Sequence, residues 1–95
     1  MFTLHVDLSV KPGMTKALED TYRVVFVPAI SKQAGFSEVK LLRATSSEAH
    51  SHRLVIAFES ETLQKKWVAT DLHQEVWPKM VANMVQFLVH NYETV

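Results

Sequence analysis

The sequence contains no cysteine and, among 95 residues, only two glycines, Gly13 and Gly35. Without cysteine the chain can form no disulfide bond, no thiolate metal site and no cysteine nucleophile. Two isolated glycines cannot build the glycine-rich loop that holds a nucleotide phosphate, so nothing in the sequence supports a flavin or nicotinamide cofactor. We therefore expect a protein that binds no cofactor.

Two further features are missing, namely an excess of charge of one sign and a long apolar run. Ten Lys and Arg residues balance ten Asp and Glu residues without concentrating in one stretch, so we expect no binding to nucleic acid or to an anionic membrane. No run approaches the roughly 18 apolar residues of a membrane-spanning helix. The first residues alternate between polar and apolar instead of forming the apolar centre of a signal peptide, which predicts a cytoplasmic protein.

The composition that remains is that of an ordinary globular protein, with 47% hydrophobic and 21% charged residues, and the length suits one domain over residues 1–95. A chain of this size buries only roughly 60 to 65% of its unfolded surface. Its own core is therefore small, and contact with a second subunit would enlarge the buried apolar surface.

Alternation of polar and apolar residues predicts four strands. The pattern runs from Phe2 to Val10 and recurs at residues 36–44, 52–60 and 85–92. A short polar loop separates the second strand from the third, which is typical of an antiparallel hairpin.

The first helical segment is predicted over residues 14–32, where apolar residues recur at helical spacing. We expect a kink or break at Pro28, because its ring would clash with the carbonyl of Val24 and remove a hydrogen bond.

The second helical segment follows the third strand. Two short helices joined near Thr70 and Asp71 fit the pattern best, and Pro78 argues against one long helix. Asp71 and Gln74 have the spacing of a capping box, which predicts the start of the second helix.

The order β-α-β-β-α-β is that of the ferredoxin-like α+β fold, in which helices cover one face of a four-stranded antiparallel sheet. The opposite face mixes polar side chains such as His5, Asp7 and Arg53 with apolar ones, and is too apolar to lie wholly in water. We expect the sheet of a second subunit to cover it in an isologous homodimer, with a solvated monomer as the alternative. The helix-covered face is predicted to hold the core, formed by Leu4, Val6, Leu8, Val39, Leu41, Leu54, Ile56, Phe58, Val85, Phe87 and Val89.

Several stretches, in this order and spacing, resemble the antibiotic biosynthesis monooxygenase family of the dimeric α/β barrel superfamily. They are residues 6–13, 33–36 and 58–60, then Leu63 and Trp67, and finally residues 70–73. The resemblance covers nearly the whole chain. It implies a homodimer whose two sheets form a barrel, with a pocket between sheet and helices in each subunit. Known enzymes of the family include cofactor-free oxygenases of quinol-like or anthrone-like aromatics and heme-degrading monooxygenases.

The sequence departs from both enzyme branches at particular positions. The heme-degrading branch is similar at Trp67, but Val6 stands at its strand-one asparagine and Trp77 at its histidine. The resemblance therefore does not imply heme ligation of that type. In the aromatic-oxidising branch an asparagine precedes the tryptophan by four residues and a tyrosine follows it by six. Those positions are Leu63 and His73 here, so one polar group is missing and the other is a different hydrogen-bonding ring.

Two residues are candidates for catalysis. Trp67 could offer its indole N–H to a substrate oxygen and its face to an aromatic ring, although a core tryptophan of a small domain would look the same in sequence. His73 could remove a phenolic proton, since its reference pKa lies near neutrality, although a histidine in a first helical turn is often a solvated or capping residue.

Four more residues are candidates for substrate binding. Trp77 and Phe26 are expected to wall the pocket, Tyr22 could point its hydroxyl into it, and Leu63 occupies the position of the missing asparagine. Packing alone would also explain the three aromatic residues.

No metal site is expected. His50 and His52 lie close together, but they have no carboxylate partner in sequence, and we expect them to be solvated.

Two functions follow from this reading. The first is a cofactor-independent monooxygenase of a small aromatic, quinol-like or anthrone-like, positioned by Trp67 and deprotonated by His73. The second is a non-catalytic dimer of the same fold that binds a small aromatic ligand or serves as a scaffold. The loss of a polar group at Leu63 favours the second, and the ring-lined pocket expected around Trp67, His73 and Trp77 favours the first.

Overall fold

A computed structural model describes residues 1–46 and 49–95 of the chain. The elements follow in the order β1 (Phe2–Val10), α1 (Thr15–Thr21), η1 (Tyr22–Phe26), α2 (Val27–Ile30), β2 (Phe36–Arg43), β3 (His52–Phe58), α3 (Glu61–Val68), α4 (Asp71–Val81) and β4 (Met84–Glu93). The predicted β-α-β-β-α-β order is confirmed. In the described part of the chain, no helix is long and apolar enough to cross a membrane.

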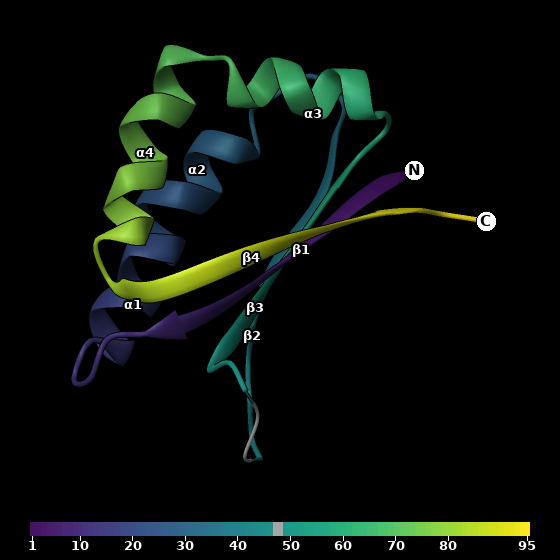
Figure 1. The fold of residues 1–95 in the computed structure, drawn as a ribbon. Coiled ribbons are helices and arrows are strands. Elements are labelled where there is room, and N and C mark those ends of the chain that lie inside the picture. The colour runs from purple at the N-terminus through teal and green to yellow at the C-terminus, as the bar shows by residue number, and fades with distance from the viewer. Residues whose placement is uncertain (47–48) are drawn as a thin grey trace.

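The four strands form one antiparallel sheet in the order β2-β3-β1-β4, and the helices lie on one of its faces (Figure 1). β1 is central and pairs on both sides: Leu4 lies opposite Ile56 of β3 and opposite Asn91 of β4. The register places Leu4, Val6 and Leu8 on the helix-covered face. This is the ferredoxin-like fold that the sequence predicts.

The first helical segment is continuous from Thr15 to Ile30 and does not break at Pro28. The expected irregularity is instead the π-helical turn η1, after which the N–H of Val27 donates to the carbonyl of Tyr22, five residues back. Pro28 follows directly after this turn, so its ring and its missing N–H fall where the regular i→i−4 hydrogen-bond pattern is already interrupted. The wider turn thus accommodates the proline without ending the helix.

The second helical segment is divided between Val68 and Asp71 into two helices, as predicted. The N-cap of α4 is Thr70, one residue before the predicted cap, because the Thr70 hydroxyl accepts the N–H of His73. Pro78 lies inside α4 and does not end it.

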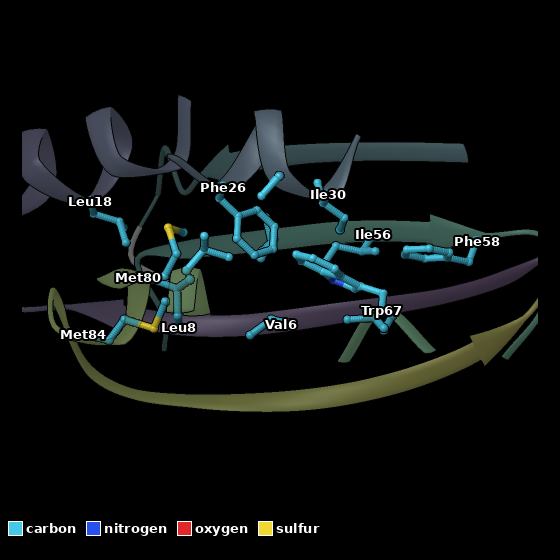
Figure 2. Packing of buried hydrophobic residues seen from close by; sticks show 14 of the residues in the cluster. Val6, Leu8, Leu18, Phe26, Ile30, Ile56, Phe58, Trp67, Met80 and Met84 are labelled. Atoms are coloured by element: carbon cyan, nitrogen blue, oxygen red, sulfur yellow. The ribbon is translucent and has the colours of Figure 1, made fainter. Parts of the chain in front are cut away.

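The core lies between the sheet and the helices. Phe26 from η1 and Trp67 from α3 are 1% and 2% exposed, and Figure 2 shows both rings inserted above β1 and β3. Met80 and Met84 close the core at the end near α1 (Figure 2). Large aromatic side chains such as these contribute more buried apolar area to a small core than any other residue type.

The prediction that β4 contributes to the core is wrong for three residues. Val85, Phe87 and Val89 are 64%, 36% and 50% exposed. Phe87 and Val89 do face the helix side, opposite Leu8 and Val6, but β4 is an edge strand and the helical layer does not cover them. Val85 is exposed where the pairing with β1 becomes irregular.

The open face of the sheet carries a charged cluster around Asp7. Arg53 donates to Asp7 at 2.6 Å. His50 and His90 approach the same carboxylate at 3.6 and 3.7 Å. Leu42 and Leu88 on this face are 46% and 63% exposed, so apolar surface surrounds the cluster.

A second polar network lies between α1 and the sheet, and it corrects the expectation that His52 is solvated. His52 is 1% exposed, with Nε2 at 2.9 Å from Glu19 and Nδ1 at 2.8 Å from Ser51. Arg43 donates to both oxygens of Glu19, through Nε at 2.7 Å and through Nη2. The carboxylate partner that His52 lacks in sequence therefore comes from α1.

This network predicts a stability loss in acid. Hydrogen bonds from Arg43 and His52 hold the pKa of Glu19 at about 2 instead of 4.5. The carboxylate therefore stabilises the fold fully above pH 4.5, and this contribution is lost as pH falls from 4.5 toward 2. Glu19→Gln should lower the free energy of unfolding at pH 7 by about 2 kcal/mol, measured by urea denaturation.

The difference between wild type and Glu19→Gln should shrink as pH falls through that window. Glu59→Gln, at an exposed position, serves as the control and should leave the free energy of unfolding unchanged. A constant difference between pH 7 and pH 3 would contradict the assignment.

Candidate functional site

A cavity of about 280 Å³ lies between the sheet and the helical layer. Leu4 and Val6 of β1 and Ile56 of β3 form its apolar floor. On the side of β4 it is bounded by Phe87 and Val89, which are themselves partly exposed. The cavity is therefore enclosed by helices on one side and open along β4 on the other.

Aromatic rings form most of the remaining wall. Trp67 meets His73 edge to face, with ring centroids 4.9 Å apart. Trp77 lies roughly parallel to His73 at 6.2 Å and meets Phe87 edge to face at 5.3 Å. Phe26 contacts both indoles, at 6.2 Å from Trp67 and 5.9 Å from Trp77. Such a set of rings is suited to hold a planar aromatic ligand.

The Thr70 hydroxyl positions the two candidate catalytic side chains. It donates to the carbonyl of Trp67 at 2.7 Å and accepts from the N–H of His73 at 3.1 Å. The same hydroxyl thus bonds the last turn of α3 and caps the N-terminus of α4. The sequence predictions for Trp67, His73, Trp77 and Phe26 placed these residues around one pocket, and all four line this cavity.

His73 brings a buried polar atom with unused hydrogen-bonding capacity into this wall. Its Nδ1 is the one buried side-chain nitrogen or oxygen without a hydrogen-bond partner in residues 1–46 and 49–95. Burial lowers the pKa of His73 from 6.5, because an imidazolium is poorly solvated between two indoles. The ring is therefore neutral at pH 7 and can accept a proton or a hydrogen bond from a ligand.

Tyr22 and Leu63 do not line the cavity in the described structure. Tyr22 stacks on Phe26 at 6.5 Å. Burial raises the pKa of the Tyr22 hydroxyl, and a hydrogen bond with the Leu41 backbone partly offsets this, so the hydroxyl points toward β2. Leu63 packs on Gly35, where an added Cβ would lie 3.0 Å from the Leu63 Cβ. Whether either residue affects ligand binding remains a prediction.

Two polar cavity residues were not found from the sequence, Gln64 of α3 and Asn91 of β4. Gln64 lies three residues before Trp67, one helical turn away, so helical spacing from the tryptophan could have found it. Asn91 alternates in phase with Phe87 and Val89, and it interrupts that apolar series with an amide. Both signals were present but were too common in sequences to single out these residues.

No three His, Asp or Glu side chains come together to hold a metal ion in residues 1–46 and 49–95.

Comparisons with known proteins agree with this fold. Residues 1–78 match the sequence profile of the family described as Antibiotic biosynthesis monooxygenase. No curated protein sequence matches the chain.

Solved structures share the fold at low sequence identity. A candidate antibiotic biosynthesis monooxygenase from Caulobacter crescentus is 16% identical, with a TM-score of 0.85 over 99% of this chain and 89% of that chain. A variant of SnoaB, a cofactor-independent oxygenase from Streptomyces nogalater, is 13% identical, with a TM-score of 0.84 over 98% and 91%. A dabb family protein with a ferredoxin-like fold from Mesorhizobium loti is 17% identical, with a TM-score of 0.80 over 99% and 96%.

The cap at Thr70 gives a prediction for this site. Thr70→Val keeps the branched shape but removes the hydroxyl, and should lower the free energy of unfolding by about 1 kcal/mol, measured by chemical denaturation. Thr70→Ser retains the hydroxyl, and its free energy of unfolding should fall much less. Equal losses in the two variants would show that the methyl group, and not the hydrogen bonds to Trp67 and His73, is what matters.

Proposed function

Because the chain belongs to the antibiotic biosynthesis monooxygenase family, we propose that it is a cofactor-independent monooxygenase that oxidises a small quinol-like or anthrone-like aromatic. The observation that carries the proposal is the ring-walled cavity containing His73, whose buried Nδ1 has no partner within the described chain. SnoaB, which shares the fold, is described as a cofactor-independent oxygenase.

The substrate itself supplies the electrons in this proposal. Neutral His73 accepts the proton of a phenolic hydroxyl, which leaves an electron-rich phenolate between the indoles. The phenolate passes one electron to O₂, and the resulting aryloxyl radical and superoxide combine to a ring peroxide. Loss of water from the protonated peroxide leaves a carbonyl. One oxygen atom thus enters the ring and the other leaves as water, so that a quinol plus O₂ gives a hydroxyquinone plus H₂O.

The protein's part is to hold, orient and deprotonate the substrate. Trp67 and Trp77 would sandwich or flank the ring, and their spacing from His73, 4.9 and 6.2 Å, keeps the imidazole within the same cavity. Neutral His73 is available as a base at pH 7 because its pKa lies below 6.5.

A second candidate function is a ligand-binding or scaffold protein without catalysis. Leu63 favours it, because this residue packs on Gly35 and contributes no polar group to the cavity. On this alternative the cavity binds the same kind of small aromatic ligand but leaves it unchanged.

We also propose that the protein is a homodimer in which two sheets pack face to face as a barrel. Leu42, Leu88 and Tyr92 are 46%, 63% and 51% exposed on the face that the helices leave open. Exposed apolar side chains gathered on one sheet face are of the kind that association covers.

Oxygen uptake tests the enzyme proposal. The purified protein, without added metal or flavin, should consume O₂ with a reduced naphthoquinol or an anthrone, and the rate should saturate with substrate. His73→Gln should lower kcat/KM roughly 100-fold, and Trp67→Phe should raise KM. His50→Gln alters a histidine outside the cavity, and its kcat/KM should equal that of the wild type. Absence of uptake above the protein-free rate would leave the binding function as the better account.

The pH profile is a second readout of the same proposal. Since burial lowers the pKa of His73 below 6.5, kcat/KM should hold steady as pH falls to 6.5 and decline only below it. This decline should be missing from the residual activity of His73→Gln. An acid limb that is unchanged in the variant would remove His73 as the base.

Sedimentation equilibrium tests the dimer. The wild type should sediment with twice the mass of the 10.8 kDa chain. Leu88→Lys should shift it toward the monomer, because a buried charge would replace an apolar contact. Val24→Lys alters a residue that is 73% exposed on the helical layer, and should leave the mass unchanged. A monomeric wild type would refute the assembly.

A further inference from the structure

Two amide side chains, Gln64 and Asn91, line the cavity in addition to His73. Neither side chain has a hydrogen-bond partner among the described residues. Each amide offers both a donor and an acceptor. Gln64 is half-buried and Asn91 is exposed, so the cavity and its open edge carry two amides that can bond a ligand, in addition to the buried imidazole nitrogen.

The fold places these amides toward one end of the cavity. Asn91 lies opposite Leu4, near the start of β1. Gln64 lies in the first half of α3, which follows the end of β3, where Phe58 pairs with Phe2. Figure 1 shows α3 above the end of the sheet where β1 begins and β4 ends. His73 enters the cavity from α4, beyond the break at Thr70, whereas Gln64 enters it from α3 and Asn91 from β4.

No charged side chain is present among the described residues that line the cavity. His73 is also uncharged at pH 7, since burial lowers its pKa. A carboxylate, phosphate or ammonium group would lose part of its hydration on entering such surroundings and would meet no compensating charge there. The cavity thus disfavours charged ligands while offering hydrogen bonds to neutral ones.

We propose that Gln64 and Asn91 are specificity-determining residues that bind a second, uncharged polar substituent on the aromatic ligand, at the end of the ring system away from His73. The inference rests on the proposed function, because it takes the ligand of His73 to be a phenol. The volume of about 280 Å³ is at the lower limit of ligand pockets, roughly 300 to 1,000 Å³. The ligand that fits both conditions is a one-ring or two-ring aromatic with neutral oxygen substituents at its two ends.

Calorimetric titration under nitrogen tests this, since without O₂ binding is measured apart from turnover. Three probes differ only at the far end: naphthol with one hydroxyl, a naphthalenediol with hydroxyls on opposite rings, and hydroxynaphthoate. The diol should bind wild type about fivefold to tenfold more tightly than naphthol, the gain expected of a net hydrogen bond. Hydroxynaphthoate should bind more weakly than either.

The variants assign the effect to particular residues. Gln64→Leu and Asn91→Leu should each reduce the advantage of the diol and leave the affinity for naphthol unchanged. His73→Leu should weaken the binding of naphthol and of the diol to the same extent. Gln86→Leu, an amide on β4 outside the cavity, is the matched control and should change nothing. Thermal unfolding of all four variants checks that the cavity is intact.

The outcomes separate the two levels of the proposal. If naphthol and diol bind equally, or if the two amide variants keep the diol's advantage, the specificity role is overturned while the His73 effect leaves the proposed function in place. Tight binding of hydroxynaphthoate would also overturn it. If none of the probes binds to wild type, both the specificity role and the proposed function fail.

Discussion

The hydroxyl group of Thr70 links the backbones of Trp67 and His73, the two residues whose side chains the cavity wall depends on. In one continuous helix, residues 67 and 73 would lie about 9 Å apart along the axis and about 120° apart around it. Thr70 instead ends α3 at the carbonyl of Trp67 and begins α4 at the N–H of His73. The chain turns between them, and the two rings meet edge to face at 4.9 Å. The cavity wall is thus a consequence of helix capping.

The opposite wall depends on a different backbone device. Pro28 cannot donate the hydrogen bond that an uninterrupted helix would require, and the π-helical turn Tyr22–Phe26 precedes it. This wider turn carries Phe26, which contacts both Trp67 and Trp77. Irregular turns of this kind are often found at functional sites. Here the irregular turn positions a ring that belongs to the core and to the cavity at once.

Such double use follows from the size of the domain. Trp67 is 2% exposed and belongs to the core cluster, yet it also lines the cavity. The two readings of this tryptophan that the sequence allowed, core residue and site residue, are therefore compatible. The helical layer covers β1 and β3 but leaves β4 exposed, so the cavity opens along that edge and the apolar residues of β4 are available for contact with a ligand or with another subunit.

Local patterns in the sequence were sufficient for the element order and the ferredoxin-like fold, and the family resemblance added the pocket that Phe26, Trp67, His73 and Trp77 line. Alternation and helical spacing report which way a side chain faces, and this is a property of neighbouring residues. The same patterns could not tell that Phe87 and Val89 face the helix side without being covered by it. They also missed the partner of His52, because Glu19 is 33 residues away in the chain.

Packing between distant segments determined the remaining side-chain positions around the cavity. The sequence could not reveal that the Tyr22 hydroxyl turns to Leu41, that Leu63 fills the space above Gly35, or that Gln64 and Asn91 meet the same cavity from a helix and a strand. Each of these depends on how the helical layer is seated on the sheet. The sequence by itself determined which residues face inward, and only the tertiary structure decided which of them meet, because those contacts join residues that are far apart in the chain.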